Sequence, residues 1–211
     1  MYPTRVAARS HVEAPEEARA ADSRAIERVL AGEPAAYRAI VERHQRGVHA
    51  VIVRLIQDRA DAEDLTQQAF LAAYDALGDF DRERRFSSWI YRIALNLAKD
   101  HLKARRRGEI PGGDAGEACA GTGARAMFAG ALPEPEASAI AGERERLLER
   151  GLASLSLADR EVLVLKDIEE LPYTELKEIL RRPVTALKIR VVRARSRLRA
   201  ALERLVEKGA L

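Results

Sequence analysis

The chain has 211 residues, of which 36 are Lys or Arg and 33 are Asp or Glu, so its formal net charge is +3. A hydrophobic content of 47% is enough for packed cores in one or two domains, which argues against a wholly disordered chain. Only 5% of the residues are aromatic, and the abundance of Ala, Leu, Arg and Glu favours helices over sheets. The one cysteine, Cys119, cannot form an intramolecular disulfide, so we expect a reducing compartment, the cytoplasm.

Residues 1–22 are rich in charged side chains and contain no apolar run, so we expect a mobile N-terminal extension and no signal peptide. The most apolar stretch, residues 48–56, is interrupted by Arg54 and is far shorter than the roughly 20 residues that cross a bilayer. We therefore expect no membrane insertion.

Residues 23–107 are expected to form a first helical domain. Over residues 35–56, apolar side chains recur mostly at intervals of three and four, which predicts an amphipathic helix. Asp58 or Asp61 is expected to cap a second helix, which Gly78 ends.

The second helix carries an acidic and amide-rich face, formed by Asp61, Glu63, Asp64, Gln67 and Gln68. From the pattern alone, a solvated face with acids near the helix N-terminus explains these residues better than a binding site.

A third long helix is expected after a charged loop, with Ser87 or Ser88 as its cap. Aromatic residues and arginines alternate around its start: Phe80, Phe86, Trp89 and Tyr91 are interleaved with Arg82, Arg84, Arg85 and Arg92. Aromatic faces beside cations can bind unpaired bases by stacking. The pattern is equally consistent with Phe86 and Trp89 being core residues at helical spacing.

Residues 108–142 are expected to be a flexible acidic linker. They hold 8 of the 13 glycines and 3 of the 8 prolines, with five acidic residues and one basic residue. Such a segment cannot bury enough apolar surface to offset its ordering entropy.

Residues 143–211 are expected to form a second domain of short helices, near 143–153, 156–167, 172–180 and 184–207. Arg181, Arg182 and Pro183 join the last two helices, and a turn of this length before a longer basic helix indicates a helix-turn-helix. The predicted fold class is therefore all-α, with two small helical domains joined by a flexible linker.

The last helix is strongly basic. Residues 183–202 contain six cationic side chains and no acidic one, while apolar residues line one side. A merely solvated helix would interleave Glu with Arg for local pairing, so the pattern favours nucleic-acid binding over a solvated surface.

The sequence contains no pattern typical of a catalytic or cofactor site, such as a phosphate-binding loop, a zinc-protease helix, a calcium loop or a dinucleotide-binding fingerprint. His44 and His49 are five residues apart and point to different sides of a helix, so they make a poor metal pair. We expect no enzymatic activity, no cofactor and no metal.

Three segments occur in an order that resembles the bacterial RNA polymerase sigma factors of the extracytoplasmic-function class: DAEDLTQQAFLAAYDAL (61–77), FSSWIYRIALNLAKDHLKARRR (86–107) and PVTALKIRVVRARSRLR (183–199). The resemblance covers residues 24–107 and 143–207. The first segment is similar to the family's polymerase-binding helix, which implies contacts with the clamp of core RNA polymerase in place of a solvated face. The implied polymerase-binding residues are Asp61, Glu63, Asp64, Gln67, Gln68 and Leu71.

The second segment is similar to the helix that melts promoters and reads the minus-ten element. The loop before it matches one that receives a flipped base in this family. The residues implied to contact minus-ten DNA are Phe80, Arg84, Arg85, Phe86, Trp89, Arg92, Asn96, Lys99 and Lys103.

The third segment follows LASLSLADREVLVLKDIEELPYTELKEIL (152–180) and looks like the helix that reads the minus-thirty-five element. The residues implied to contact this DNA are Arg181, Arg182, Thr185, Lys188, Arg190, Arg193 and Arg197. The family usually has Gly and an apolar residue where this chain has Arg181 and Arg182, and a small Ala in place of Lys177.

The resemblance implies a transcription initiation factor that has no chemistry of its own. Its implied partners are core RNA polymerase, through the clamp and flap regions, promoter DNA and, in many members, an anti-sigma factor. The overall charge of +3 predicts weak DNA binding by the free protein. Two alternatives stay open: a DNA-binding regulator that needs no polymerase, and a polymerase-binding protein whose altered turn no longer reads DNA.

Overall fold

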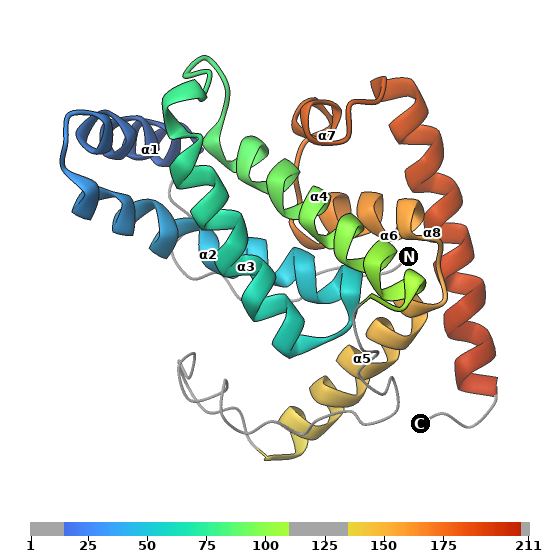
Figure 1. Cartoon of the computed structure of the whole chain (residues 1–211). Coiled ribbons are helices and arrows are strands. Elements are labelled where there is room, and N and C mark those ends of the chain that lie inside the picture. The colour runs from blue at the N-terminus through green and yellow to red at the C-terminus, as the bar shows by residue number, and fades with distance from the viewer. Residues whose placement is uncertain (1–14, 110–134, 208–211) are drawn as a thin grey trace.

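The computed structural model describes residues 15–109 and 135–207, and all regular structure in these residues is helical (Figure 1). This confirms the predicted all-α class. Most of the expected linker, including Cys119, lies outside the described residues. Within the described ranges, no helix combines the length and the apolar composition that a membrane crossing requires.

The N-terminal half, residues 15–109, is built on three long helices that pack on one another. Ile40, Val48 and Ile52 of one helix are fully buried, as the spacing of three and four predicts. Its elements are α1 (Pro15–Leu30), η1 (Pro34–Ala36), α2 (Tyr37–Ile56), α3 (Arg59–Asp75), η2 (Leu77–Asp79) and α4 (Phe86–Arg107).

α1 begins at Pro15, inside the range 1–22 that was expected to be a mobile extension. The buried carboxylate of Asp22 holds α1 against α2, because it binds Arg43 at 2.6 Å and His44 at 2.9 Å. These long-range contacts leave no local signal in the sequence, which is why the helix was missed.

Helix caps follow the sequence in one case and not in another. Asp58 caps α3, because its side chain accepts a hydrogen bond from the backbone of Asp61 at 3.1 Å. The expected cap of α4 by Ser87 or Ser88 is wrong. Arg85 occupies the cap position without a side-chain bond, and the hydroxyl of Ser88 is buried against the other half of the molecule.

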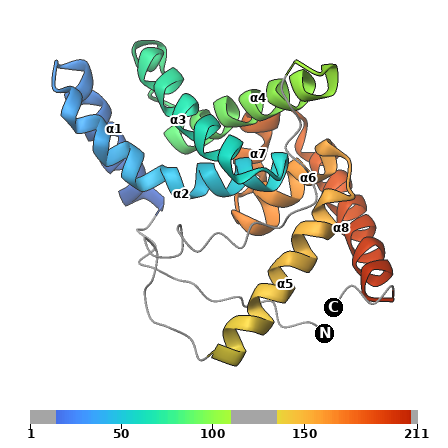
Figure 2. The ribbon, with the colours of Figure 1, turned by 60° about the horizontal axis from the view of Figure 1, so that its bottom comes forward.

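The C-terminal half, residues 135–207, matches the predicted series of short helices, and α5 and α8 lie side by side (Figure 2). α5 begins at Pro135, inside the range 108–142 that was expected to be linker. The elements are α5 (Pro135–Ala153), α6 (Leu157–Leu163), the π-helical turn η3 (Val164–Ile168), α7 (Tyr173–Leu180) and α8 (Val184–Glu207).

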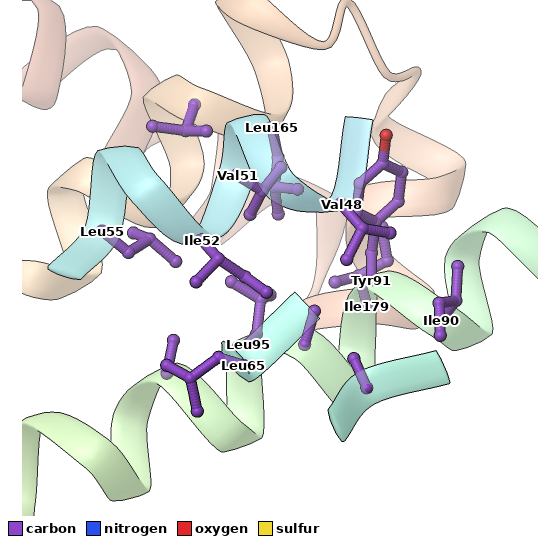
Figure 3. Close-up of a cluster of buried hydrophobic side chains, with 14 of the residues drawn as sticks. Val48, Val51, Ile52, Leu55, Leu65, Ile90, Tyr91, Leu95, Leu165 and Ile179 are labelled. Atoms are coloured by element: carbon purple, nitrogen blue, oxygen red, sulfur yellow. The ribbon is translucent and has the colours of Figure 1, made fainter. Parts of the chain in front are cut away.

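The two halves share one hydrophobic core. α4 contacts α7 and α2 contacts α6, and a single cluster of buried side chains crosses the boundary. Figure 3 shows Leu165 beside Val51 of α2, and Ile179 beside Tyr91 of α4. The halves therefore pack as one body.

Candidate nucleic-acid interface

α3 presents an exposed face with one large apolar residue at its centre. Asp64, Gln67 and Gln68 are exposed, and Leu71 on the same face has 64% of its surface in solvent. Burial of Leu65 and Ala69 on the opposite side fixes this orientation. An exposed leucine among amide groups is suited to a partner protein.

Of two further acidic residues predicted for this face, one is exposed to solvent and the other turns toward a neighbouring helix. Glu63 is exposed, but Asp61 turns toward α4, where its carboxylate lies 3.1 Å from Nε2 of His101. Tyr74, which was not among the predicted residues, is 39% exposed one turn beyond Leu71. Its helical spacing from Leu71 is the signal that could have indicated it.

The aromatic residues around the start of α4 form a packed cluster. The ring centroids of Phe80 and Trp89 are 4.9 Å apart, and those of Phe86 and Trp89 are 5.6 Å apart. Phe80 and Phe86 are buried, and Trp89 is half-buried. In this conformation, Phe80 and Phe86 pack as core residues, and Trp89 is the most accessible ring of the three.

The predicted minus-ten cations of α4 and its preceding loop contact carboxylates of the C-terminal half. Arg84 binds Glu178 at 3.0 Å, Arg85 binds Glu175 at 3.2 Å, and Lys99 binds Glu161 at 3.0 Å. The glutamates come from α7 and α6, far along the chain, so no local sequence pattern indicated these pairs.

Three other predicted minus-ten residues have different surroundings. Asn96 is exposed, and Lys103 pairs with Asp100 of its own helix at 3.1 Å. Arg92 is half-buried, and burial together with the nearby guanidinium groups of Arg181 and Arg84 lowers its pKa.

α8 packs through Leu187, Val191 and Ala194, as its apolar stripe predicts. Arg190 and Arg197 both reach the carboxylate of Asp159, which is 1% exposed. These two arginines therefore connect α8 to α6 in addition to any role toward DNA.

The outward face of α8 carries the remaining predicted DNA-binding residues. Thr185, Lys188 and Arg193 are exposed, and among the described residues neither cation has an acidic partner. The same face exposes Ile189 and Val192, at 54% and 65%, which the charge pattern did not indicate.

Two exposed arginines, Arg181 and Arg182, lie in the turn between α7 and α8. Arg181 ends α7 in the left-handed conformation, with φ of 51° and ψ of 45°, where the family pattern has glycine. Arg182 is exposed, and both arginines line a groove with Lys177 and Arg84. The two helices and this turn make the predicted helix-turn-helix.

The part of the chain that the structure describes contains no group of three His, Cys, Asp or Glu side chains placed to hold a metal ion. His44 binds Asp22. Burial lowers the pKa of His49, whose ring lies on another side of α2.

Two family models match this chain in tandem: sigma-70 region 2 over residues 40–108 and sigma-70 region 4 over residues 145–198. RNA polymerase sigma-H factor of Pseudomonas aeruginosa is 33% identical over 89% of the chain and 97% of its own length. The chain belongs to the extracytoplasmic-function class of sigma-70 factors. It is a promoter-specific transcription initiation factor, from a family of non-enzymatic proteins.

Further relatives of this sigma factor agree. ECF RNA polymerase sigma factor SigW of Bacillus subtilis is 32% identical, over 85% of this chain and 96% of the relative. ECF RNA polymerase sigma-E factor of Escherichia coli K12 is 32% identical, over 87% and 95%. Among solved structures, CnrH in complex with the cytosolic domain of CnrY has a TM-score of 0.60 at 26% identity, and the match covers 88% of this chain and 96% of that one.

Proposed function

We propose that this sigma factor binds the clamp of core RNA polymerase through α3, opens the minus-ten region through α4 and reads the minus-thirty-five element through α8. The observation that carries the proposal is the outward face of α3, where Asp64, Gln67, Gln68 and Leu71 lie together in solvent. Leu71 and Tyr74, one turn apart, form an exposed apolar patch rimmed by these polar side chains, and a patch of this kind suits a contact with a partner protein.

α8 supports the DNA-binding part of the proposal. Lys188 and Arg193 supply cations for phosphates and base edges in the major groove. Ile189 and Val192 lie beside them, and apolar side chains at such positions contact the methyl group of thymine. We therefore extend the predicted minus-thirty-five residues by these two.

Reconstituted transcription tests the whole proposal. Promoters are selected from a random DNA library with bacterial core polymerase and this protein, and run-off transcripts are measured on a selected template. Core enzyme with the sigma factor should give defined transcripts that core enzyme alone does not give. A protein that binds duplex DNA alone and yields no transcript would instead be an ordinary regulator.

Asp64→Ala tests the α3 surface. We expect core polymerase to bind this variant about tenfold more weakly, since a charge-assisted contact contributes about 1.5 kcal/mol. Glu27→Ala is the control, because it removes one exposed carboxylate from α1. Equal affinity of the two variants would contradict the role of α3.

We further propose that the C-terminal half also contacts the polymerase flap, that the protein acts in the bacterial cytoplasm, and that all catalysis belongs to polymerase. An anti-sigma factor is the expected inhibitor. The solved structures of similar fold include the sigma factor RpoE bound to the anti-sigma factor NepR, from Bartonella quintana. The product of a neighbouring gene that blocks binding of this chain to core polymerase would identify such a partner.

A further inference from the structure

Carboxylates of the C-terminal half cover one side of α4 and the loop before it. Glu161 binds the Lys99 ammonium at 3.0 Å, and Glu169 accepts a hydrogen bond from the Tyr91 hydroxyl at 2.9 Å. Two further glutamates on α7 make similar contacts, and we call the set of four the acidic row: Glu161, Glu169, Glu175 and Glu178.

The lower part of the acidic row contacts the start of α4. Glu175 accepts hydrogen bonds from Arg85 at 3.2 Å and from the Ser88 hydroxyl at 3.1 Å. Glu178 accepts one from Arg84 at 3.0 Å. In every one of these contacts the C-terminal half supplies the negative group and the N-terminal half supplies the donor.

Two members of the row are buried too deeply to be chance surface contacts. The side chain of Glu161 is 8% exposed and that of Glu175 is 10% exposed. A carboxylate removed from water is stable only when cations and donors replace the lost hydration. Lys99 supplies an opposite charge to Glu161, and Arg85 and Ser88 donate hydrogen bonds to Glu175. The apolar contacts in Figure 3 hold the same boundary together.

Gly47 in the middle of α2 leaves space for this arrangement. A Cβ atom at this position would lie 2.4 Å from the Tyr91 hydroxyl oxygen and 3.1 Å from Oε2 of Glu169. A glycine in a helix interior costs about 1 kcal/mol relative to alanine. Here the missing side chain allows the hydrogen bond from Tyr91 to Glu169.

We propose that the free chain is autoinhibited: the acidic row occupies the DNA-binding side of α4 in place of DNA phosphates. This inference rests on the proposed function of α4. The same cations cannot bind both glutamates and phosphates, so closure of the two halves and DNA binding by α4 compete. Attachment of the halves to polymerase separates them and frees α4.

Repulsion between arginines opposes the packing of the two halves and keeps the closure reversible. Closure brings Arg181 of the C-terminal half near Arg92, beside Arg84 of the N-terminal half. Burial, together with these like charges, lowers the pKa of Arg92. The closed form is thus held by the acidic row and the shared core against a local repulsion.

The test compares two doubly substituted full-length proteins of equal net charge. The interface variant carries Glu161→Gln and Glu175→Gln. The control carries Glu203→Gln and Glu207→Gln, which remove two exposed carboxylates from α8. Small-angle X-ray scattering reports the separation of the halves, and fluorescence anisotropy reports affinity for a labelled single-stranded DNA of mixed sequence.

We expect the interface variant to expand and to bind this DNA at least about tenfold more tightly than wild type, as it should if nine-tenths or more of the free chain is closed. The control should scatter like wild type and bind within about twofold of it. Gly47→Ala should also expand the protein, without any change of charge. Unchanged scattering of both the interface variant and Gly47→Ala would overturn the closure, and expansion without a gain in DNA affinity would overturn the masking.

Failure of the proposed function has a separate signature. If wild-type protein gives no run-off transcripts with core polymerase, that function is contradicted, whereas the scattering of the free chain tests the closure by itself. An interface variant that expands and gains affinity supports autoinhibition whichever promoter the factor selects.

Discussion

Asp159 lies in the first turn of α6 with 1% of its surface exposed, and two arginines of α8 converge on its carboxylate. Arg190 and Arg197 were predicted from the sequence as DNA contacts. In the structure they also satisfy a buried charge, which would otherwise be strongly destabilising. A loss of DNA binding after substitution of either arginine could therefore arise from weakened folding alone.

Arg190→Ala and Arg193→Ala should therefore differ. We expect Arg190→Ala to lower the free energy of unfolding by about 1–2 kcal/mol, because Asp159 keeps only one arginine. Arg193→Ala should leave stability within about 0.5 kcal/mol of wild type and weaken upstream promoter binding by the holoenzyme. Urea unfolding and promoter footprinting measure the two effects. Equal losses of stability would contradict this division.

Arg181 has a strained backbone conformation that glycine would adopt without strain. Its φ of 51° is in the left-handed region, which costs a residue with a side chain about 1 kcal/mol or more. We expect Arg181→Gly to raise the free energy of unfolding by about 1 kcal/mol. Arg182→Gly, which replaces the next arginine outside that region, is the control and should not stabilise the protein. Thermal unfolding of both variants provides the measurement.

At the scale of elements, the contact between α5 and α8 depends on a small residue. A Cβ atom on Gly151 would lie 2.7 Å from the Leu202 side chain and 3.0 Å from that of Leu198, whereas one on Gly142 of the same helix meets nothing within 4 Å. Gly142→Ala should stabilise the protein by up to about 1 kcal/mol through helix propensity.

Gly151→Ala should be less stable than Gly142→Ala by about 2 kcal/mol, because overpacking opposes the same gain. Chemical denaturation of the two variants makes the comparison. If both alanines stabilised the protein equally, the close approach of α5 and α8 would be wrong.

Local patterns account for the elements that the sequence predicted. The spacing of three and four in α2, the cap at Asp58 and the apolar stripe of α8 all act within a few residues, so they can be read without the fold. The Ser88 hydroxyl could not be placed this way, because its partner is Glu175 of α7. The predicted site was limited in the same way. Helical spacing was enough to predict that the α3 face is exposed, but it could not predict the carboxylates that lie beside the α4 cations.

At the scale of the whole molecule, the sequence indicated two separate helical domains and the structure packs them on one core. We therefore expect the free chain to unfold in one cooperative transition, with equal calorimetric and van't Hoff enthalpies. Differential scanning calorimetry tests this expectation. Two resolved transitions in the wild-type protein would contradict it, and the Glu161→Gln, Glu175→Gln variant should move toward two.

Arg160 limits how freely the C-terminal half could be exchanged with that of a relative. Its guanidinium donates to the carbonyl oxygen of Leu55 at 2.7 Å, at the end of α2, and to that of Ala153 at 2.8 Å, at the end of α5. Both carbonyls lie in final helical turns, where the helix itself offers no partner. A chimera that lacked this arginine would lose one bond across the boundary, to the end of α2, and one inside the C-terminal half, to the end of α5. Recombination would therefore succeed best when the arginine and both acceptors are kept together.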